Sequence, residues 1–280
     1  MISSTYFRFS VGIGMSKKEC TSGPERFDNY YKEIYGQRWE SLKKSLVQES
    51  KPVLLSDKLI SPYYMDKASI IAASILPISE NNSVLDMCAA PGGKTLVLSL
   101  RLNGSGSLVS NDRSASRRNR LINVLDTCLP KKLRDTVKVT GHDSTRWSLY
   151  EKSVYDSILL DAPCSSERHV INDQNYLSLW SPNRPKVLSK QQFSMLCAAL
   201  DAVKPGGFIL YSTCSICPME NQMVIDRLFK KRSGQFIEID MLTINPELEI
   251  LSEAQEHGRI ILPDTQDGLG PLYFCLLRRS

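Results

Sequence analysis

Short apolar runs alternate with longer segments of helical spacing along most of this 280-residue chain. Runs typical of buried strands occur at 83–86, 108–109, 137–140, 155–161, 208–212 and 272–277. Helical segments are predicted at 68–76, from 94 onward, and at 114–127, 190–203 and 219–231. Because strands separated by helices favour a parallel sheet with helices on both faces, we expect a doubly wound, Rossmann-like α/β domain.

The first part of the chain has a different pattern. Aromatic side chains, among them Phe27, Tyr31 and Trp39, recur at helical spacing between residues 25 and 48, which predicts one or two amphipathic helices that pack on the core. We therefore divide the chain into a partly helical extension, 1–62, and a catalytic domain, 63–280. Met15 offers a second start, so residues 1–14 are either a start-site extension or a weak targeting segment.

Composition excludes several classes of protein. With 42% hydrophobic and 23% charged residues, the chain is neither collagen-like nor wholly disordered. No apolar run approaches the roughly 18 residues that a membrane helix needs, and no secretory signal is evident. The eight cysteines are too scattered for a disulfide framework, which favours an intracellular protein. Cys214 and Cys217 have C-x-x-C spacing but lack a second pair, so we expect no metal site.

Positive charge is concentrated in one segment. The net charge of the chain is +5, whereas residues 101–138 contain nine Lys and Arg against three Asp, a local surplus of +6. A basic surface of this kind suits a polyanion such as nucleic acid, and an ordinary solvated helix face is the alternative interpretation.

Acids and cysteines follow the predicted strands. Asp86 ends one of them, Asp112 and Asp143 come shortly after two others, Cys164 follows a fourth through Asp161-Ala-Pro, and Cys214 follows the fifth. Ligands of doubly wound sheets bind at the carboxyl ends of the strands, near the point where strand order reverses. These side chains are therefore the candidate site.

The loop after the first of these strands resembles two nucleotide-binding motifs without matching either. Gly93-Lys94-Thr95 could end a P-loop, but Cys88 stands where its first glycine is required, and the G-x-G-x-x-G fingerprint is absent. Asp112 lies at the offset of an acid that binds ribose hydroxyls. A ribose-bearing ligand without phosphates, such as S-adenosylmethionine, fits this pattern, with Asp143 for the adenine amine and the glycine loop near the amino-acid end.

The two strand-end cysteines indicate the reaction. Neighbouring strands would bring Cys164 and Cys214 to one crevice, although two buried structural thiols are the alternative. Methylation of C5 of a pyrimidine requires a nucleophile to add at C6 first, whereas methylation of an amine does not. Asp161 could contact N3 of the base as charge develops.

Three motifs, in order, resemble those of the Sun/Fmu (RsmB-like) family of RNA cytosine-5 methyltransferases. They are Asp86-Met-Cys-Ala-Ala-Pro-Gly-Gly-Lys-Thr95, Leu160-Asp-Ala-Pro-Cys-Ser165 and Tyr211-Ser-Thr-Cys-Ser215, and the likeness extends over about 63–279. The resemblance implies that Cys214 is the nucleophile, that Cys164 aids product release, and that Asp161 contacts the base. It implies S-adenosylmethionine as cofactor, at positions Cys88, Ala89, Gly92, Gly93, Lys94, Asp112, Arg117, Asp143 and Asp161.

Three further segments resemble the mitochondrial rRNA and tRNA branch of that family: Tyr63-Tyr-Met-Asp-Lys-Ala-Ser69, Glu167-Arg168-His169 and Gly270-Pro-Leu-Tyr-Phe-Cys-Leu-Leu-Arg-Arg279. A bacterial relative is equally consistent with these segments. We expect an RNA substrate, rRNA before tRNA, and a monomer that either borrows RNA affinity from an accessory RNA-binding protein or uses residues 101–138. The expected location is a bacterial-type cytoplasm, with the mitochondrial matrix as the alternative.

Some positions and functions stay open. Glu220 and Asn221 are interpreted as first-turn residues of a helix, His142 is given no chemistry, and His169 is either a contact of the target nucleotide or a surface residue. The alternative functions are a nitrogen methyltransferase and a catalytically silent RNA- or ribosome-binding factor on the same fold.

Overall fold

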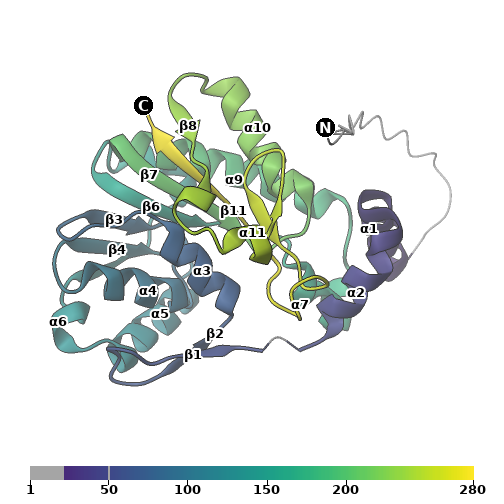
Figure 1. Ribbon diagram of the computed structural model, residues 1–280, viewed down its shortest axis with the longest axis horizontal. Coiled ribbons are helices and arrows are strands. Elements are labelled where there is room, and N and C mark those ends of the chain that lie inside the picture. Colours follow the sequence, from purple (N-terminus) through teal and green to yellow (C-terminus); the bar gives the residue numbers. More distant parts are fainter. Residues whose placement is uncertain (1–21, 50) are drawn as a thin grey trace.

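A computed structural model describes residues 22–49 and 51–280 of the chain. The expectations about residues 1–14 and Met15 lie outside the described residues. The described chain forms a nine-stranded sheet with helices on both faces, and a separate two-stranded sheet (Figure 1). Among the described residues, no helix has both the length and the apolar character to cross a membrane.

Five parallel strands form the centre of the large sheet, as predicted: β3 Ser83–Asp86, β4 Ser107–Asn111, β5 Val137–Thr140, β6 Tyr155–Asp161 and β7 Val203–Thr213. The sheet is completed by four strands in antiparallel pairings: β8 Phe236–Glu238, β9 Glu253–Ala254, β10 Arg259–Ile261 and β11 Leu272–Arg279.

The strand order is β5-β4-β3-β6-β7-β11-β10-β9, with β8 paired to β11. The chain runs outward from β3 through β4 to β5, and then returns to place β6 on the other side of β3. Strand order therefore reverses between β3 and β6, where a doubly wound sheet opens a crevice at its carboxyl edge.

Two groups of helices cover the two faces of the sheet. One face packs against α3 Lys67–Ile75, α4 Gly93–Leu102, α5 Ala115–Cys128, α6 Lys131–Arg134 and α11 Leu248–Leu251. The other face packs against α1 Gly23–Tyr35, α2 Trp39–Val47, α7 Glu167–Asn172, α9 Asn183–Ala202 and α10 Gln222–Lys231. The remaining helices are α8 Gln174–Ser178 and the 3-10 helices η1 Gly36–Arg38, η2 Ser144–Leu149, η3 Pro218–Glu220 and η4 Met241–Thr243.

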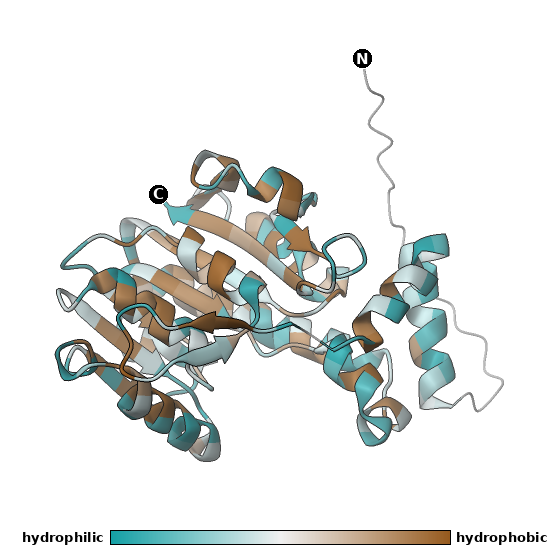
Figure 2. Ribbon diagram, turned by 60° about the horizontal axis from the view of Figure 1, so that its bottom comes forward, coloured by the Kyte–Doolittle hydropathy of each residue, from teal (hydrophilic) through white to brown (hydrophobic). Residues whose placement is uncertain are grey.

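Successive strand residues point into opposite halves of the core. On β6, Ile158 and Leu160 belong to the cluster under α9, while Leu159 belongs to the cluster under α3 and α4. Figure 2 shows hydrophobic colour along strands of the sheet and mixed colour on the surrounding helices. Because both faces are covered, the strands are continuous apolar runs in the sequence.

The N-terminal aromatic residues pack on the core, as the sequence predicted. Helix α1 starts at a capping box between Ser22 and Glu25. The Phe27 ring lies 4.8 Å from that of Tyr31 and 5.2 Å from that of Trp180, centroid to centroid. The hairpin of β1 Val53–Leu55 and β2 Tyr63–Met65 then leads into α3.

Three predicted boundaries differ from the structure. Helix α9 begins at Asn183, several residues before the predicted start, because Pro185 is in its first turn, where the ring is tolerated. Strand β7 begins at Val203, several residues before the predicted start at 208, because an irregularity in its pairing with β6 accommodates Pro205. The helix predicted over 219–231 is divided into η3 and α10.

Candidate active site

The two strand-end cysteines meet at the carboxyl edge of the sheet. Strands β6 and β7 pair in parallel with Asp161 opposite Ser212, so the loops after them start side by side. The Sγ atoms of Cys164 and Cys214 are 3.1 Å apart, and Ser166 Oγ lies 3.2 Å from Cys214 Sγ. Cys214 is exposed, whereas Cys164 is partly covered.

The surroundings shift the pKa values of the two thiols in opposite directions. A hydrogen bond with Cys164, assisted by one from Ser166, lowers the pKa of Cys214, although the surrounding protein partly desolvates the thiol and acts in the opposite direction. The same Cys164–Cys214 hydrogen bond, together with burial, raises the pKa of Cys164 well above its usual value. Since the thiolate is the nucleophilic form of cysteine, Cys214 is the more reactive of the pair.

Asp161 lies beside the thiols and is held on both carboxylate oxygens. Ser212 Oγ donates to Oδ1 at 2.9 Å, and Lys94 Nζ lies 2.8 Å from Oδ2 and 3.1 Å from Ser69 Oγ. Burial lowers the pKa of Lys94, but the Asp161 carboxylate more than compensates and raises it above its usual value. Lys94 therefore keeps its positive charge and fixes the orientation of Asp161.

A cavity of about 120 Å³ opens between the glycine loop and Asp161. Gly93 begins α4 in its wall, and a Cβ there would stand 3.0 Å from the Tyr63 ring. Gly92 has a φ of +123°, a backbone conformation that residues with a side chain rarely adopt. Asp86 lines the same cavity; burial raises its pKa to about 7, and its Oδ1 has no hydrogen-bond partner among the described residues.

Asp112 has an acceptor available for a ligand. Its Oδ1 accepts from the Ser114 amide, whereas Oδ2 is buried without a hydrogen-bond partner among the described residues and lies 3.4 Å from Arg117 Nη2. Arg117 also donates to the Ala90 carbonyl at 2.7 Å. A buried carboxylate oxygen without a hydrogen bond at this strand end fits the ribose hydroxyls of S-adenosylmethionine, so the residues present suit that group.

The other predicted cofactor positions form the walls of this region. The Ala89 amide donates to the Asn111 carbonyl at 2.8 Å and joins the loops after β3 and β4. Cys88 is buried, and burial raises the pKa of its thiol. Asp143 caps η2. Burial acts to raise its pKa, but hydrogen bonds from Thr145 outweigh burial and lower that pKa. Arg113 Nη1 lies 3.5 Å from Asp143 Oδ2.

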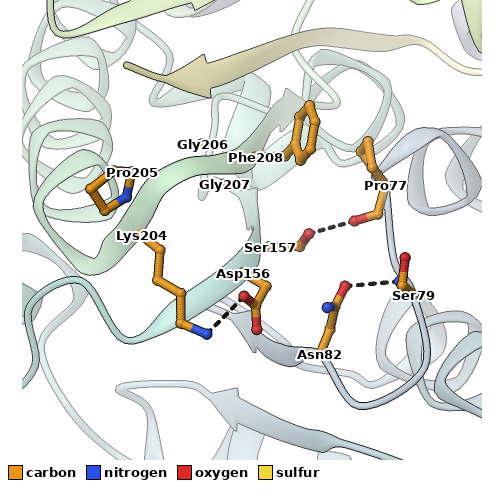
Figure 3. A pocket seen from close by; sticks show the side chains of 10 residues that line it. All are labelled: Pro77, Ser79, Asn82, Asp156, Ser157, Lys204, Pro205, Gly206, Gly207 and Phe208. Atoms are coloured by element: carbon orange, nitrogen blue, oxygen red, sulfur yellow. Dashed lines mark hydrogen bonds and ion pairs between the residues drawn. The ribbon is translucent and has the colours of Figure 1, made fainter.

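A second cavity, of about 310 Å³, lies at the opposite edge of the sheet, where β6 and β7 begin (Figure 3). Its polar groups are paired with one another: Lys204 Nζ lies 2.7 Å from Asp156 Oδ1, and the Ser79 amide donates to Asn82 Oδ1 at 2.8 Å. The residues that line it include no cysteine or histidine. The strand-end site is therefore the better candidate for chemistry.

Several site residues were missed or left open by sequence analysis. Ser166 carries no motif signal of its own, and its contact with Cys214 depends on two loops folding together. Glu220 and Asn221, whose role was left open, are buried and hydrogen-bonded within the site. Cys217 is buried with its Sγ 3.3 Å from Tyr30 Oη, so it does not join Cys214. Within the described ranges, no cluster of residues suited to a metal ion was found.

A parallel sheet whose strand order reverses beside a glycine loop, with acids at the strand ends, is typical of the Rossmann-like methyltransferase class. The model of the 16S rRNA methyltransferase RsmB/F family matches residues 73–278, and the chain belongs to this family. The fold agrees with a methyltransferase homologue from Pyrococcus horikoshii, with a TM-score of 0.69, 19% identity, and coverage of 91% of this chain and 94% of that one.

Two curated relatives illustrate the range of the family. The chain is 35% identical over 233 residues to 5-cytosine rRNA methyltransferase NSUN4 of Bos taurus, and the match covers 79% of this chain and 60% of the relative. It is 32% identical over 223 residues to the mitochondrial tRNA (cytosine(34)-C(5))-methyltransferase of Danio rerio, and the match covers 78% of this chain and 60% of the relative. The chain thus spans about three-fifths of the length of these relatives.

Proposed function

We propose that the protein transfers a methyl group from S-adenosylmethionine to C5 of a cytosine in RNA, through a covalent bond between Cys214 and C6. The observation that carries the proposal is the pair of thiols 3.1 Å apart on neighbouring strand ends, with Asp161 beside them. A methyltransferase for amines needs no such pair, because an amine is already nucleophilic. Membership of the RsmB/F family supports the same chemistry.

The first step depends on the acidity of the two thiols. Cys214, as thiolate, adds to C6 and breaks the C5–C6 double bond, which leaves an electron pair shared between C5 and the rest of the ring. Asp161 contacts N3 and supports protonation there as charge develops. The target cytosine has to be unpaired or flipped for C6 to reach Cys214.

S-adenosylmethionine, when bound, supplies an electrophilic methyl group. Asp112 would hold the ribose, Asp143 would face the adenine amine, and Gly92, Gly93 and Lys94 would border the amino-acid end. Cys88, Ala89 and Arg117 shape the walls of this site.

Cys164 acts in product release. Once Cys214 is bonded to carbon, the thiolate that raised the pKa of Cys164 is gone, so Cys164 loses its proton to solvent more readily. Its thiolate then takes the proton from C5 as the bond between Cys214 and C6 breaks, which restores the aromatic ring and frees Cys214.

The RNA substrate is an rRNA in preference to a tRNA, because the NSUN4 relatives are named as rRNA enzymes. Exposed basic residues just before α5, on α5 and on α6 supply a surface for the phosphate backbone: Arg113, Arg117, Arg120, Lys131 and Lys132. We also propose that the protein is a monomer and that an accessory RNA-binding protein assists its binding to RNA. Two tRNA relatives are named as mitochondrial, which favours the mitochondrial matrix over a bacterial-type cytoplasm.

Methyl transfer from labelled S-adenosylmethionine to rRNA and tRNA, followed by nucleoside analysis, tests this function. We expect label in 5-methylcytosine with the wild type and none with Cys214→Ser. Label in a nitrogen-methylated base, or full activity in Cys214→Ser, would support the nitrogen methyltransferase instead. RNA binding without any transfer would support the silent binding factor.

A further inference from the structure

Two buried glutamates lie behind the catalytic cysteines, one on each of the two loops. Glu167 follows the Cys164 loop and begins α7, and Glu220 ends η3 after the Cys214 loop. Both side chains are fully inaccessible to solvent. Within the described part of the chain, neither glutamate forms an ion pair with a Lys, Arg or His. Two unpaired carboxylates at one buried place need an explanation, because each buried charge is costly.

Each glutamate binds the loop of the other. Glu167 Oε2 accepts from the Ile216 amide at 3.0 Å, and its Oε1 lies 3.0 Å from Ser215 Oγ, both in the Cys214 loop. Glu220 Oε2 accepts from the Ser165 amide at 2.9 Å, in the Cys164 loop. The two side chains therefore cross between the loops and fix one loop against the other.

The hydroxyl of Ser215 lies between the two carboxyl groups. Ser215 Oγ is 3.0 Å from Glu167 Oε1 and 3.1 Å from Glu220 Oε1, and it also accepts from the Cys217 amide at 3.0 Å. A hydroxyl has one proton and can donate to only one of the two carboxyl oxygens. The other carboxyl group must carry a proton of its own to form a hydrogen bond with Ser215.

The remaining contacts indicate which glutamate is ionised. Tyr31 Oη donates to Glu167 Oε1 at 2.5 Å, a distance typical of a hydroxyl bound to a charged carboxylate. With Ser215 and Ile216, Glu167 then accepts three hydrogen bonds. Glu220 accepts from Ser165 and from Gln192 Nε2 on its Oε2, which leaves Oε1 to hold a proton and donate to Ser215.

We propose that Glu167 and Glu220 are positioning residues that share one proton through Ser215, with the proton on Glu220, and that they hold Cys164 and Cys214 at their reactive separation. Burial and the neighbouring Glu220 raise the pKa of Glu167 to about 8, and burial also raises the pKa of Glu220, so the pair binds a proton more readily than exposed carboxylates do. The hydrogen bonds that Tyr31, Ser215 and Ile216 donate to Glu167 place that proton on Glu220. Tyr31 extends the arrangement to α1, so the N-terminal helices support the active site directly. This inference rests on the proposed function only for its effect on methylation.

The test compares Glu220→Gln with Glu220→Leu. A Gln amide can accept from Ser165 and Gln192 and donate to Ser215, as a protonated Glu does, whereas Leu can do neither. We expect Glu220→Gln to keep at least about a third of the wild-type kcat. Glu220→Leu should lose about 100-fold in kcat with little change in the KM for RNA, as expected of misplaced catalytic groups. Ser215→Ala, which removes only the shared hydroxyl, gives a milder second variant in case Glu220→Leu does not fold.

A second readout does not depend on methylation. The rate at which diamide joins Cys164 to Cys214, followed by mass spectrometry of the linked peptides, measures how often the thiols meet. It should be unchanged in Glu220→Gln and roughly tenfold lower in Glu220→Leu, with a smaller fall in Ser215→Ala. Glu238→Ala is the matched control: Glu238 accepts from the Gly258 amide at 2.7 Å on the β8 side of the sheet, away from both cysteines.

The outcomes separate the two proposals. Unchanged disulfide rates in Glu220→Leu and Ser215→Ala would overturn the positioning role, whatever the methylation assay shows. A loss of kcat in Glu220→Gln equal to that in Glu220→Leu would overturn the assignment of the proton. Altered disulfide rates in a protein that never methylates RNA would leave the positioning role intact and overturn only the proposed function.

Discussion

Lys94 on α4 and Asp161 at the end of β6 form an ion pair of 2.8 Å that joins the glycine loop to the strand end carrying Cys164. Only 13% of the Lys94 side chain and 29% of the Asp161 side chain are exposed. The pair therefore stands at the boundary between the cavity proposed for the cofactor and the thiols proposed for the nucleotide, and contributes to both.

Removal of one partner of this pair should destabilise the fold. We expect Lys94→Met to lower the free energy of unfolding by about 1–3 kcal/mol, less than for a fully buried pair because Asp161 retains some contact with solvent. The double variant Lys94→Met/Asp161→Asn should recover part of the loss, since no unpaired carboxylate remains. Urea denaturation of these variants and of Asp161→Asn measures this, and strictly additive effects would contradict it.

Ser166 should control the acidity of Cys214. Removing its hydroxyl takes away a hydrogen bond that lowers the pKa of Cys214, so that pKa should rise in Ser166→Ala. The thiolate exists above the pKa, so alkylation of Cys214 by iodoacetamide should begin at higher pH in the variant than in the wild type. Mass spectrometry at the Cys214 peptide measures the rate at each pH.

Ser165→Ala is the control for that experiment. Ser165 is adjacent in sequence, but its hydroxyl is buried without a partner among the described residues. The alkylation profile should not move in this variant. Equal profiles in Ser166→Ala and wild type would show that Ser166 does not tune Cys214.

Asp112 should contribute strongly to cofactor affinity. Its Oδ2, which accepts no hydrogen bond from the described residues, would gain a charge-assisted hydrogen bond to ribose, worth about 1.5–3 kcal/mol. We expect Asp112→Ala to weaken S-adenosylmethionine binding by about 10- to 150-fold in calorimetry. Asp126→Ala, which removes an exposed partner of Arg134 at the far end of α5, should leave the affinity unchanged. A loss below twofold in Asp112→Ala would remove Asp112 from the cofactor site.

Arg38 should link the N-terminal helices to the rest of the protein. Its guanidinium lies 2.6 Å from Glu253 Oε1 and 2.7 Å from Asp264 Oδ2, and the Asp264 side chain is 3% exposed. Arg38→Met leaves that buried carboxylate without its partner, so we expect a loss of about 2–3 kcal/mol of stability. Thermal unfolding should remain a single transition, and two separate transitions would show that the helices fold independently.

The basic surface of α5 and α6 should account for part of the RNA affinity. Neutralising Arg120 and Lys131 together should reduce the slope of log K against log salt by roughly 0.7 for each phosphate group that the variant no longer neutralises. Filter binding at several salt concentrations measures the slope. Lys230→Ala/Lys231→Ala on α10 is the control and should keep the wild-type slope, and a wild-type slope in the Arg120 and Lys131 variant would exclude these positions of α5 and α6 from the interface.

The parallel sheet, its helices and the meeting of Cys164 with Cys214 were predictable from the sequence. Buried parallel strands are continuous apolar runs, and the residues after each strand lie at one edge of the sheet. The support behind the thiols was not predictable. Ser166 and Glu167 contact the Cys214 loop across 48 residues of sequence, and Tyr31 reaches Glu167 across 136. Such contacts depend on tertiary packing, and a buried Glu has no local pattern that distinguishes it from an exposed one.

The most direct test of the account is a covalent-trapping gel with Cys164→Ala. The variant is incubated with S-adenosylmethionine and, in separate reactions, with rRNA or tRNA, then denatured and examined for a protein band shifted by attached RNA. We predict a shifted band with one of the RNAs, and its disappearance when Cys214 is also changed to Ala. Absence of the band with both RNAs, while the wild type transfers methyl groups to RNA, would contradict the two-cysteine mechanism.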